Sequence, residues 1–134
     1  MDMFSTLDIS ASALLAQRTR LDSIAQNVAN TRTTRSADGK VEPFKRKFVV
    51  FQSGQPDDPS RPGVRAQVRE DASFRTDYDP GHSDADASGY VRYPNIDMAV
   101  EYVNAMEASR AYEANVTTME VTKAMINASL RLLG

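Results

Sequence analysis

The sequence holds one short run of potential metal ligands, in which a histidine and two aspartates alternate with other residues. His82, Asp84 and Asp86 form an H-x-D-x-D pattern, and imidazole nitrogen together with carboxylate oxygen can bind a divalent cation. His82 is the only histidine, and the chain has no cysteine. The glycine, serine and aspartate residues around it favour a solvated loop whose aspartates cap turns. We therefore expect no metal ligands and no cofactor here.

The same residues give little support for catalysis. A serine–histidine–aspartate arrangement or a pair of acid–base carboxylates needs a defined cleft, and the sequence indicates none. We expect no catalytic residues and a chain that is not an enzyme. A metal-dependent enzyme that uses the His82 loop remains a rival interpretation, which stoichiometric metal binding would support.

The most basic stretch lies in the first half of the chain and is bordered by aromatic residues. It comprises Arg32, Arg35, Lys45, Arg46 and Lys47, with Phe44 and Phe48 beside the lysines. Aromatic and basic side chains together can bind nucleic acid, whereas a positive strand edge can resist aggregation or meet acidic residues of a neighbouring subunit. We favour inter-subunit contacts through Lys45, Arg46 and Lys47. A small nucleic-acid-binding module that uses this strand is the alternative function.

Composition points to protein partners. The 134 residues carry 16 lysines and arginines against 18 aspartates and glutamates, a formal charge of −2, so no overall field attracts nucleic acid or an anionic membrane. No apolar run approaches the roughly 20 residues of a membrane span. Residues 1–16 lack the basic and apolar regions of a secretory signal peptide.

The N-terminal segment predicts an amphipathic helix over Ser5–Asn30. Leu7, Leu14, Leu21 and Val28 recur at intervals of seven, and Ile24 falls at a helical offset from them. Ser5 and Asp8 have capping-box spacing, which would place the start of the helix at Ser5. We expect the helix to end near Asn30.

The C-terminal segment predicts a longer helix over Ile96–Leu133. Pro94 and Asn95 are typical of a helix start. Its expected a and d positions, eight of ten apolar, are Tyr102, Ala105, Ser109, Tyr112, Val116, Met119, Lys123, Ile126, Leu130 and Leu133. Ser109 and Lys123 on this seam are either snorkelling exceptions or register-setting polar residues. A helix this long needs a partner, and antiparallel pairing with the N-terminal helix is the economical arrangement.

Between the helices the sequence predicts strands and loops. Lys47–Gln52 and Val64–Ala72 are strand candidates joined by a turn-rich connection, so we expect a small hairpin. Tyr90–Tyr93 is a candidate third strand, and Asp77–Gly89 is expected to be an irregular loop. The expected fold is α+β and mainly α: an N-terminal helix in 1–31, a β-rich insertion in 32–94 and a C-terminal helix in 95–134, with the two helices paired as an antiparallel coiled coil.

The terminal helices carry more apolar surface than one pair can hide. Met98, Met106, Met125 and Leu132 lie off the expected seam and extend the apolar surface around the helix. Extra surface of this kind implies further subunits. We assign to the assembly interface Leu7, Leu14, Leu21, Ile24, Asn27, Val28, Asn30, Tyr102, Met106, Tyr112, Val116, Met119, Ile126, Leu130 and Leu133.

Three stretches resemble a known family. Residues 26–31 (QNVANT) resemble the asparagine-rich signature that ends the first helix of flagellar axial proteins. Residues 78–97 (YDPGHSDADASGYVRYPNID) and 106–116 (MEASRAYEANV) resemble the loop and the C-terminal helix of the FlgC family of flagellar basal-body rod proteins. The resemblance covers essentially the whole chain. Ser83 departs from it, because the family usually has proline there.

The resemblance implies a non-enzymatic subunit of the proximal rod. Such a subunit is exported without a cleaved signal peptide by the flagellar type III apparatus and polymerises helically in the periplasm, where the rod transmits motor torque. The implied partners are further copies and the rod proteins FlgB, FlgF and FlgG, with the adaptor FliE at the base. No cofactor is implied.

Overall fold

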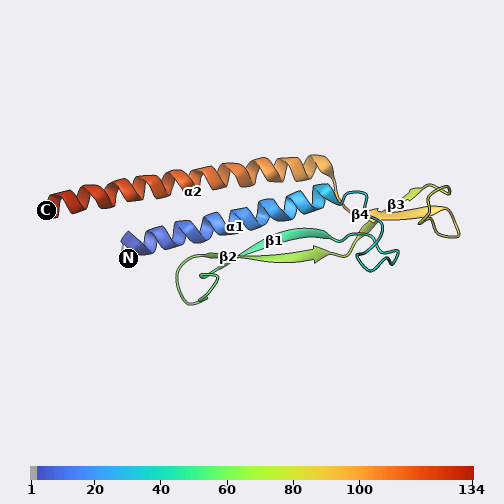
Figure 1. The fold of residues 1–134 in the computed structure, drawn as a ribbon, viewed down its shortest axis with the longest axis horizontal. Coiled ribbons are helices and arrows are strands. Elements are labelled where there is room, and N and C mark those ends of the chain that lie inside the picture. The colour runs from blue at the N-terminus through green and yellow to red at the C-terminus, as the bar shows by residue number, and fades with distance from the viewer. Residues whose placement is uncertain (1–2) are drawn as a thin grey trace.

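A computed structural model of the chain describes residues 3–134 and contains two long helices with four short strands between them. Helix α1 spans Met3–Ala29 and helix α2 spans Met98–Leu133. They lie side by side in opposite directions, so the two ends of the chain lie at the same end of an elongated molecule (Figure 1). The predicted α+β class, dominated by paired terminal helices, is confirmed. Residues 1 and 2 of the predicted N-terminal segment lie outside the described residues.

The helix starts differ from the predicted ones. The first described helical residue of α1 is Met3, so Ser5 lies within the helix and does not cap it. Helix α2 begins at Met98 rather than Ile96, because the carboxylate of Asp97 accepts hydrogen bonds from the amides of Ala99 and Val100. The predicted end of the N-terminal helix near Asn30 is close to the observed one.

The predicted hairpin is present and lies against α1. Strands β1 (Arg46–Ser53) and β2 (Val64–Asp71) pair antiparallel, from Arg46 opposite Asp71 to Ser53 opposite Val64. Gly54 opens the connecting loop with a φ of 112°, and its amide donates to the carbonyl of Gly63 at 3.0 Å. Helix α1 contacts both strands on one side and α2 on another, so it is the middle layer of the molecule (Figure 1).

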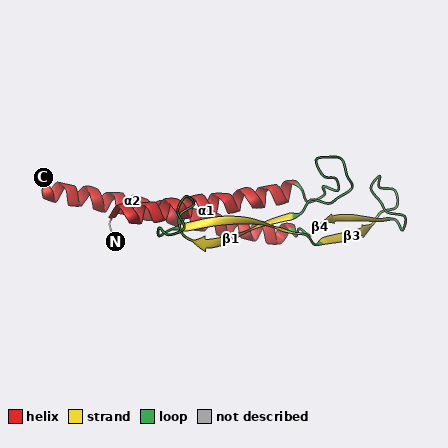
Figure 2. Cartoon of the chain, turned by 90° about the horizontal axis from the view of Figure 1, so that it is seen from below, coloured by secondary structure: helices red, strands yellow, loops and turns green. Residues whose placement is uncertain are grey.

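A second hairpin projects past the helix ends. Strand β3 (Phe74–Tyr78) pairs antiparallel with β4 (Tyr90–Pro94), and both figures place this ribbon beyond α1 and α2 (Figure 2). The expected third strand therefore forms, but it pairs with β3 rather than with the first hairpin. The predicted irregular loop was wrong at Asp77 and Tyr78, which belong to β3. Tyr78 lies opposite Tyr90, and the two rings make an edge-to-face contact at 5.3 Å.

The face of α2 that packs on α1 is built from small and polar residues up to Asn115 and includes the larger Val116, Met119 and Ile126 beyond it. Ala108 is fully buried, and on α1 Ala16 is 2% exposed. Buried and half-buried positions of α2 recur at helical spacing through Glu101, Ala105, Ala108, Ala111, Asn115 and Met119. Small side chains let the two helix backbones approach closely, whereas bulky ones would hold them apart.

The predicted seam of α2 was therefore half right. Its column Ala105, Met119 and Ile126 is half-buried, with Tyr112 at its edge. In the other column Val116 is half-buried, but Tyr102, Ser109, Lys123 and Leu130 are exposed. The buried positions nearest to this column are displaced by one residue, to Glu101 and Ala108. Exposure of Ser109 and Lys123 leaves neither of them a register-setting role in the helix pair.

We expect Ala108→Leu to destabilise the chain, because the larger side chain must fit where the helices touch. Overpacking of this kind costs about 1–3 kcal/mol in free energy of unfolding. Ala114→Leu, at an exposed position of the same helix, is the matched control and should change stability little. Chemical denaturation followed by circular dichroism measures both, and equal effects would show that Ala108 does not lie in the packed face.

Candidate functional site: an uncovered helix face and a buried polar junction

Several large apolar side chains of α2 lie on the side away from α1. Tyr102, Val103 and Met106 expose 57, 57 and 54% of their surface, and helical spacing places them next to one another. Further along the helix, Val121 and Met125 are also more than half exposed. The face that α2 turns away from its partner thus carries several large apolar side chains that remain more than half exposed.

Helix α2 also runs past the start of α1. Two side-chain contacts fix the register of the pair: Asn27 with Glu101, and Arg20 with Glu107. Because the helices are antiparallel, about the last two turns of α2 extend beyond Met3. These turns carry Leu130, Leu132 and Leu133, of which Leu132 is 89% exposed. Figure 1 shows this overhang at the C-terminal end.

The residues assigned from sequence to the assembly interface fall into three groups. Ile24 and Asn27 are buried within the chain. Leu7, Leu14, Leu21, Val28, Asn30, Val116, Met119 and Ile126 are half-buried. The exposed members are Tyr102, Met106, Tyr112, Leu130 and Leu133. In the exposed group every member except Tyr112, at 37%, exposes more than half of its surface. The first two groups also stabilise the chain itself.

A junction of buried polar groups lies where α1, β1 and α2 meet, and the sequence analysis did not predict it. Asn27 of α1 is fully buried, and its side chain pairs with the backbone of β1. Its Oδ1 accepts from the Lys47 amide at 2.8 Å, and its Nδ2 donates to the Lys47 carbonyl at 2.7 Å. The side chain therefore satisfies both backbone groups of Lys47, as a neighbouring strand would.

The third member of the junction is Glu101 of α2, whose side chain is fully buried. Its Oε1 accepts from the Nε of Arg46 at 2.6 Å, and its Oε2 accepts from the Nδ2 of Asn27 at 3.3 Å. Arg46 is itself only 23% exposed. A buried carboxylate needs such partners, because an unpaired charge is strongly unfavourable away from water. One charge pair and one amide thus join α1, β1 and α2.

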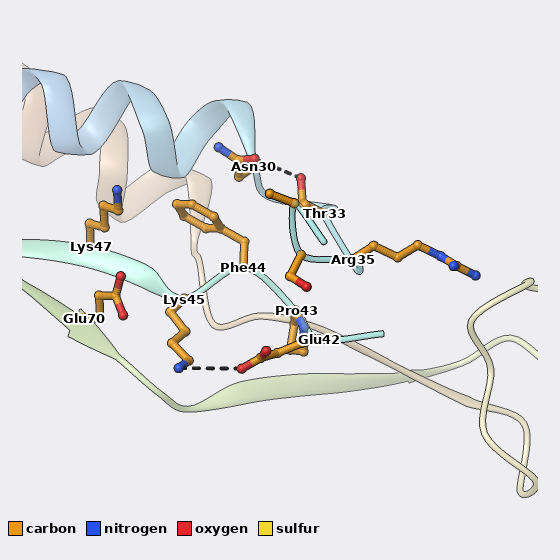
Figure 3. A pocket seen from close by; sticks show the side chains of 11 residues that line it. Asn30, Thr33, Arg35, Glu42, Pro43, Phe44, Lys45, Lys47 and Glu70 are labelled. Atoms are coloured by element: carbon orange, nitrogen blue, oxygen red, sulfur yellow. Dashed lines mark hydrogen bonds and ion pairs between the residues drawn. The ribbon is translucent and has the colours of Figure 1, made fainter. Parts of the chain in front are cut away.

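The basic stretch is largely paired within the chain. Arg46 binds Glu101, the Nζ of Lys45 lies 3.6 Å from Glu42, and the Nζ of Lys47 donates to the Oε1 of Gln26 at 2.7 Å. Lys45 and Lys47 line an open groove of about 550 Å³ at the end of α1, together with Phe44, Glu42 and Glu70 (Figure 3). Because the groove carries both signs of charge, it does not favour a polyanion such as nucleic acid.

The H-x-D-x-D residues make hydrogen bonds within and between the loops. Asp84 accepts hydrogen bonds from the Thr34 hydroxyl and the Arg35 guanidinium, while its own amide donates to the Nδ1 of His82 at 3.0 Å. Asp86 accepts from the amides of Ser88 and Tyr90. Among residues 3–134, no group of three or more histidines, aspartates and glutamates is arranged to hold a metal ion. Neither described helix combines the length and apolar character needed to cross a bilayer.

This geometry defines an elongated structural protein, whose terminal helices pair through small residues and leave a broad apolar face uncovered. The chain is 38% identical to flagellar basal-body rod protein FlgC of Bacillus subtilis (strain 168), an alignment covering 98% of this chain and 99% of that protein. It is 42% identical to FlgC of Yersinia enterocolitica over 98% of both chains. Against FlgC of Aquifex aeolicus (strain VF5) the identity is 43%, over 92% of this chain and 91% of the relative.

Residues 87–132 also match the family described as flagellar basal body rod FlgEFG protein C-terminal, so the match spans β4 and nearly all of α2. The chain belongs to the FlgC family of flagellar basal-body rod proteins. The uncovered face of α2 therefore lies within the segment that the FlgEFG family shares.

The contact of Asp84 with Thr34 and Arg35 should weaken in acid. Hydrogen bonds from Arg35 and then Thr34 lower the pKa of Asp84 below its ordinary value of 3.8. A lowered pKa in the folded chain means that the ionised carboxylate stabilises this contact above about pH 4, and that the stabilisation is lost as pH falls through the folded pKa. NMR shifts of the Thr34 and Arg35 amides should therefore change at acid pH.

Asp84→Asn is the control for this titration. The variant has no carboxylate to protonate, so its Thr34 and Arg35 amide shifts should lose that acid transition. A transition of unchanged size and midpoint in the variant would mean that another group, and not Asp84, controls this loop contact.

Proposed function

We propose that this chain is a structural subunit of the proximal rod of the bacterial flagellum, which polymerises helically through its terminal helices and transmits motor torque. Membership of the FlgC family supports a structural role in the rod. The observation that carries the rest is the distribution of side chains around α2, where Ala108 is buried and Tyr102, Val103 and Met106 are exposed. A self-contained helix pair would have the opposite arrangement.

An uncovered face of this kind stabilises contacts between subunits. Burial of apolar surface contributes roughly 25 cal/mol per Å², so several half-exposed aromatic and aliphatic side chains on one helix contribute substantially when a neighbour covers them. The chain offers different surfaces at its two ends: an overhang of α2 at one end and the β3–β4 ribbon at the other. Contacts between unlike surfaces that do not close into a ring generate helical polymers.

The remaining assignments rest on the family resemblance. The proposed partners are further copies, the rod proteins FlgB, FlgF and FlgG, and the adaptor FliE, in the periplasmic part of the basal body. The chain would reach this location through the flagellar export apparatus, without cleavage of a signal peptide. Residues 1–31 and 95–134 would form the helical core of the assembly, and residues 32–94 an outer layer. The role is mechanical rather than enzymatic.

We expect Val103→Asp and Met106→Asp to abolish rod incorporation, because each places a charge in an apolar contact. Both positions are more than half exposed, so the helix content of the free chain should not change. Its free energy of unfolding should stay within about 0.5 kcal/mol of that of the original chain. Val103→Ile, which keeps the position apolar, should support normal assembly. Motility and recovery of the chain in isolated basal bodies measure the effect. Normal motility with both aspartate variants would refute an interface on this face.

The inter-subunit role proposed for the basic stretch narrows to Lys45 and Lys47, because the guanidinium of Arg46 is held by Glu101. Lys45→Glu should weaken assembly by repelling an acidic neighbouring subunit, without changing the far-ultraviolet circular dichroism spectrum. Lys40→Glu is the control, since Lys40 is also exposed and also pairs loosely with a nearby acid, Asp38. Equal incorporation of both variants into basal bodies would remove Lys45 from the interface.

A further inference from the structure

Within the buried junction, Asn27 is bound more closely to β1 than to α2. Asn27 and β1 make two short hydrogen bonds, at 2.7 and 2.8 Å, that do not involve α2. The contact between Asn27 and Glu101 is longer, at 3.3 Å. Glu101 of α2 instead makes its short contact with Arg46 of β1, an ion pair at 2.6 Å. One side of the junction can therefore form without α2, whereas Glu101 cannot be accommodated without Arg46.

Other contacts also join α1 to the first hairpin independently of α2. The Val64 amide donates to the Ser12 hydroxyl at 2.9 Å. Arg61 also pairs with Asp8 at 3.0 Å, but both side chains are at least half exposed, so this ion pair is weak. Lys47 adds its hydrogen bond to Gln26. These contacts lie at both ends of the hairpin, so α1 and the hairpin are joined along most of their common length.

Helix α2 has fewer specific contacts of this kind. Its other ion pair, Glu107 with Arg20, is weak because the Glu107 side chain is 68% exposed and well solvated. Near its start, Met98 accepts a hydrogen bond from the Thr31 hydroxyl through sulfur. The seam itself combines alanines and polar residues with the half-buried side chains of Val116, Met119 and Ile126, so its apolar packing is not tied to one residue. Glu101 is consequently the main polar anchor of α2.

We propose that α1 and the first hairpin fold together first and present a carboxylate receptor, which is formed by Arg46 and Asn27. Helix α2 then packs onto them in a second step, in which the Glu101 carboxylate binds this receptor. The receptor contains no residue of α2, because Asn27 lies in α1 and Arg46 in β1. Without the receptor, the Glu101 carboxylate would lose its water and gain no partner. The hairpin thus controls pairing of the terminal helices, and a chain whose hairpin is unfolded keeps α2 undocked.

A small cavity beside the junction gives the receptor room to bind a free carboxylate. It measures about 150 Å³ and is lined by Arg20, Ser23, Arg46 and Glu101, among others. Removal of the Glu101 side chain beyond Cβ would enlarge this cavity by about the volume of an acetate ion and leave Arg46 without its counter-ion. Acetate should therefore occupy the vacated receptor, which a purely packing role for Glu101 would not predict.

Hydrogen exchange of the full chain, resolved by peptide mass spectrometry, tests the order of docking. Glu101→Ala should accelerate exchange of the amides of residues 98–108 by roughly a hundredfold, the expected effect of breaking a buried pair. The amides of β1 and β2 should keep their protection. Asn27→Ala should accelerate both sets, because it removes the bonds that hold β1 as well as one donor to Glu101.

Acetate and two further variants complete the test. Acetate, and not chloride at equal ionic strength, should restore part of the protection lost in Glu101→Ala. Glu107→Ala, which removes the exposed ion pair of the same helix, should have little effect. If Glu101→Ala does not fold, Glu101→Gln keeps the shape of the side chain and should loosen residues 98–108 alone.

Three results would overturn the proposal. The first is equal loss of protection in the hairpin and in α2 after either Glu101 substitution, which would mean that the three segments fold as one unit. The second is unprotected exchange of residues 98–108 in the original chain. The third is equal restoration by chloride and acetate.

Discussion

The structure depends on one buried charge. Glu101 brings a carboxylate into the interior at the point where α1, β1 and α2 meet, and Arg46 and Asn27 supply its partners. Replacement of a buried ion pair by apolar residues is often tolerated, whereas loss of one partner is strongly unfavourable. Such a pair therefore specifies which segments come together more than it stabilises them. Here it fixes how α2 lies on α1 at the end where the central hairpin joins them.

That constraint explains how the helices can pair through a seam of small residues. Ala16 and Ala108 allow close approach but bury little apolar surface. Large apolar residues of α2 such as Val103 and Met106 face outward and are more than half exposed. In the proposed assembly these exposed residues are available for contacts between subunits, whereas Glu101 and its polar partners position α2 within the chain.

The sequence predicted the elements well and their faces less well. Heptad spacing of leucines identified α1, and β-branched and aromatic residues identified β1 and β2, because these patterns are local. The buried face of α2 was misplaced because apolarity was taken to mark the seam, whereas the seam follows Glu101, Ala108 and Asn115 at the same spacing. The sequence did not predict β3, because all of its residues are exposed and the three between its terminal aromatic residues are polar.

The candidate site was predictable only in part, for the same reason. An excess of apolar surface on α2 could be inferred from Met106 and Met125 lying off the expected seam, and both are exposed. The polar junction could not, because Glu101 also suits the first turn of a helix and Arg46 also suits a solvated strand edge. The one signal present was a carboxylate seven residues before an alanine, Ala108, and it can be interpreted only from the long-range contacts of Glu101.

Cysteine labelling tests most directly whether the outer face of α2 is covered by neighbouring subunits. The chain contains no cysteine, so a single Val103→Cys substitution gives one reporter at a position that is 57% exposed in the free chain. A maleimide should label this cysteine rapidly in the purified chain and be excluded from it in isolated basal bodies. Equal labelling in both would contradict the account, because the face would then remain open to water in the assembled rod.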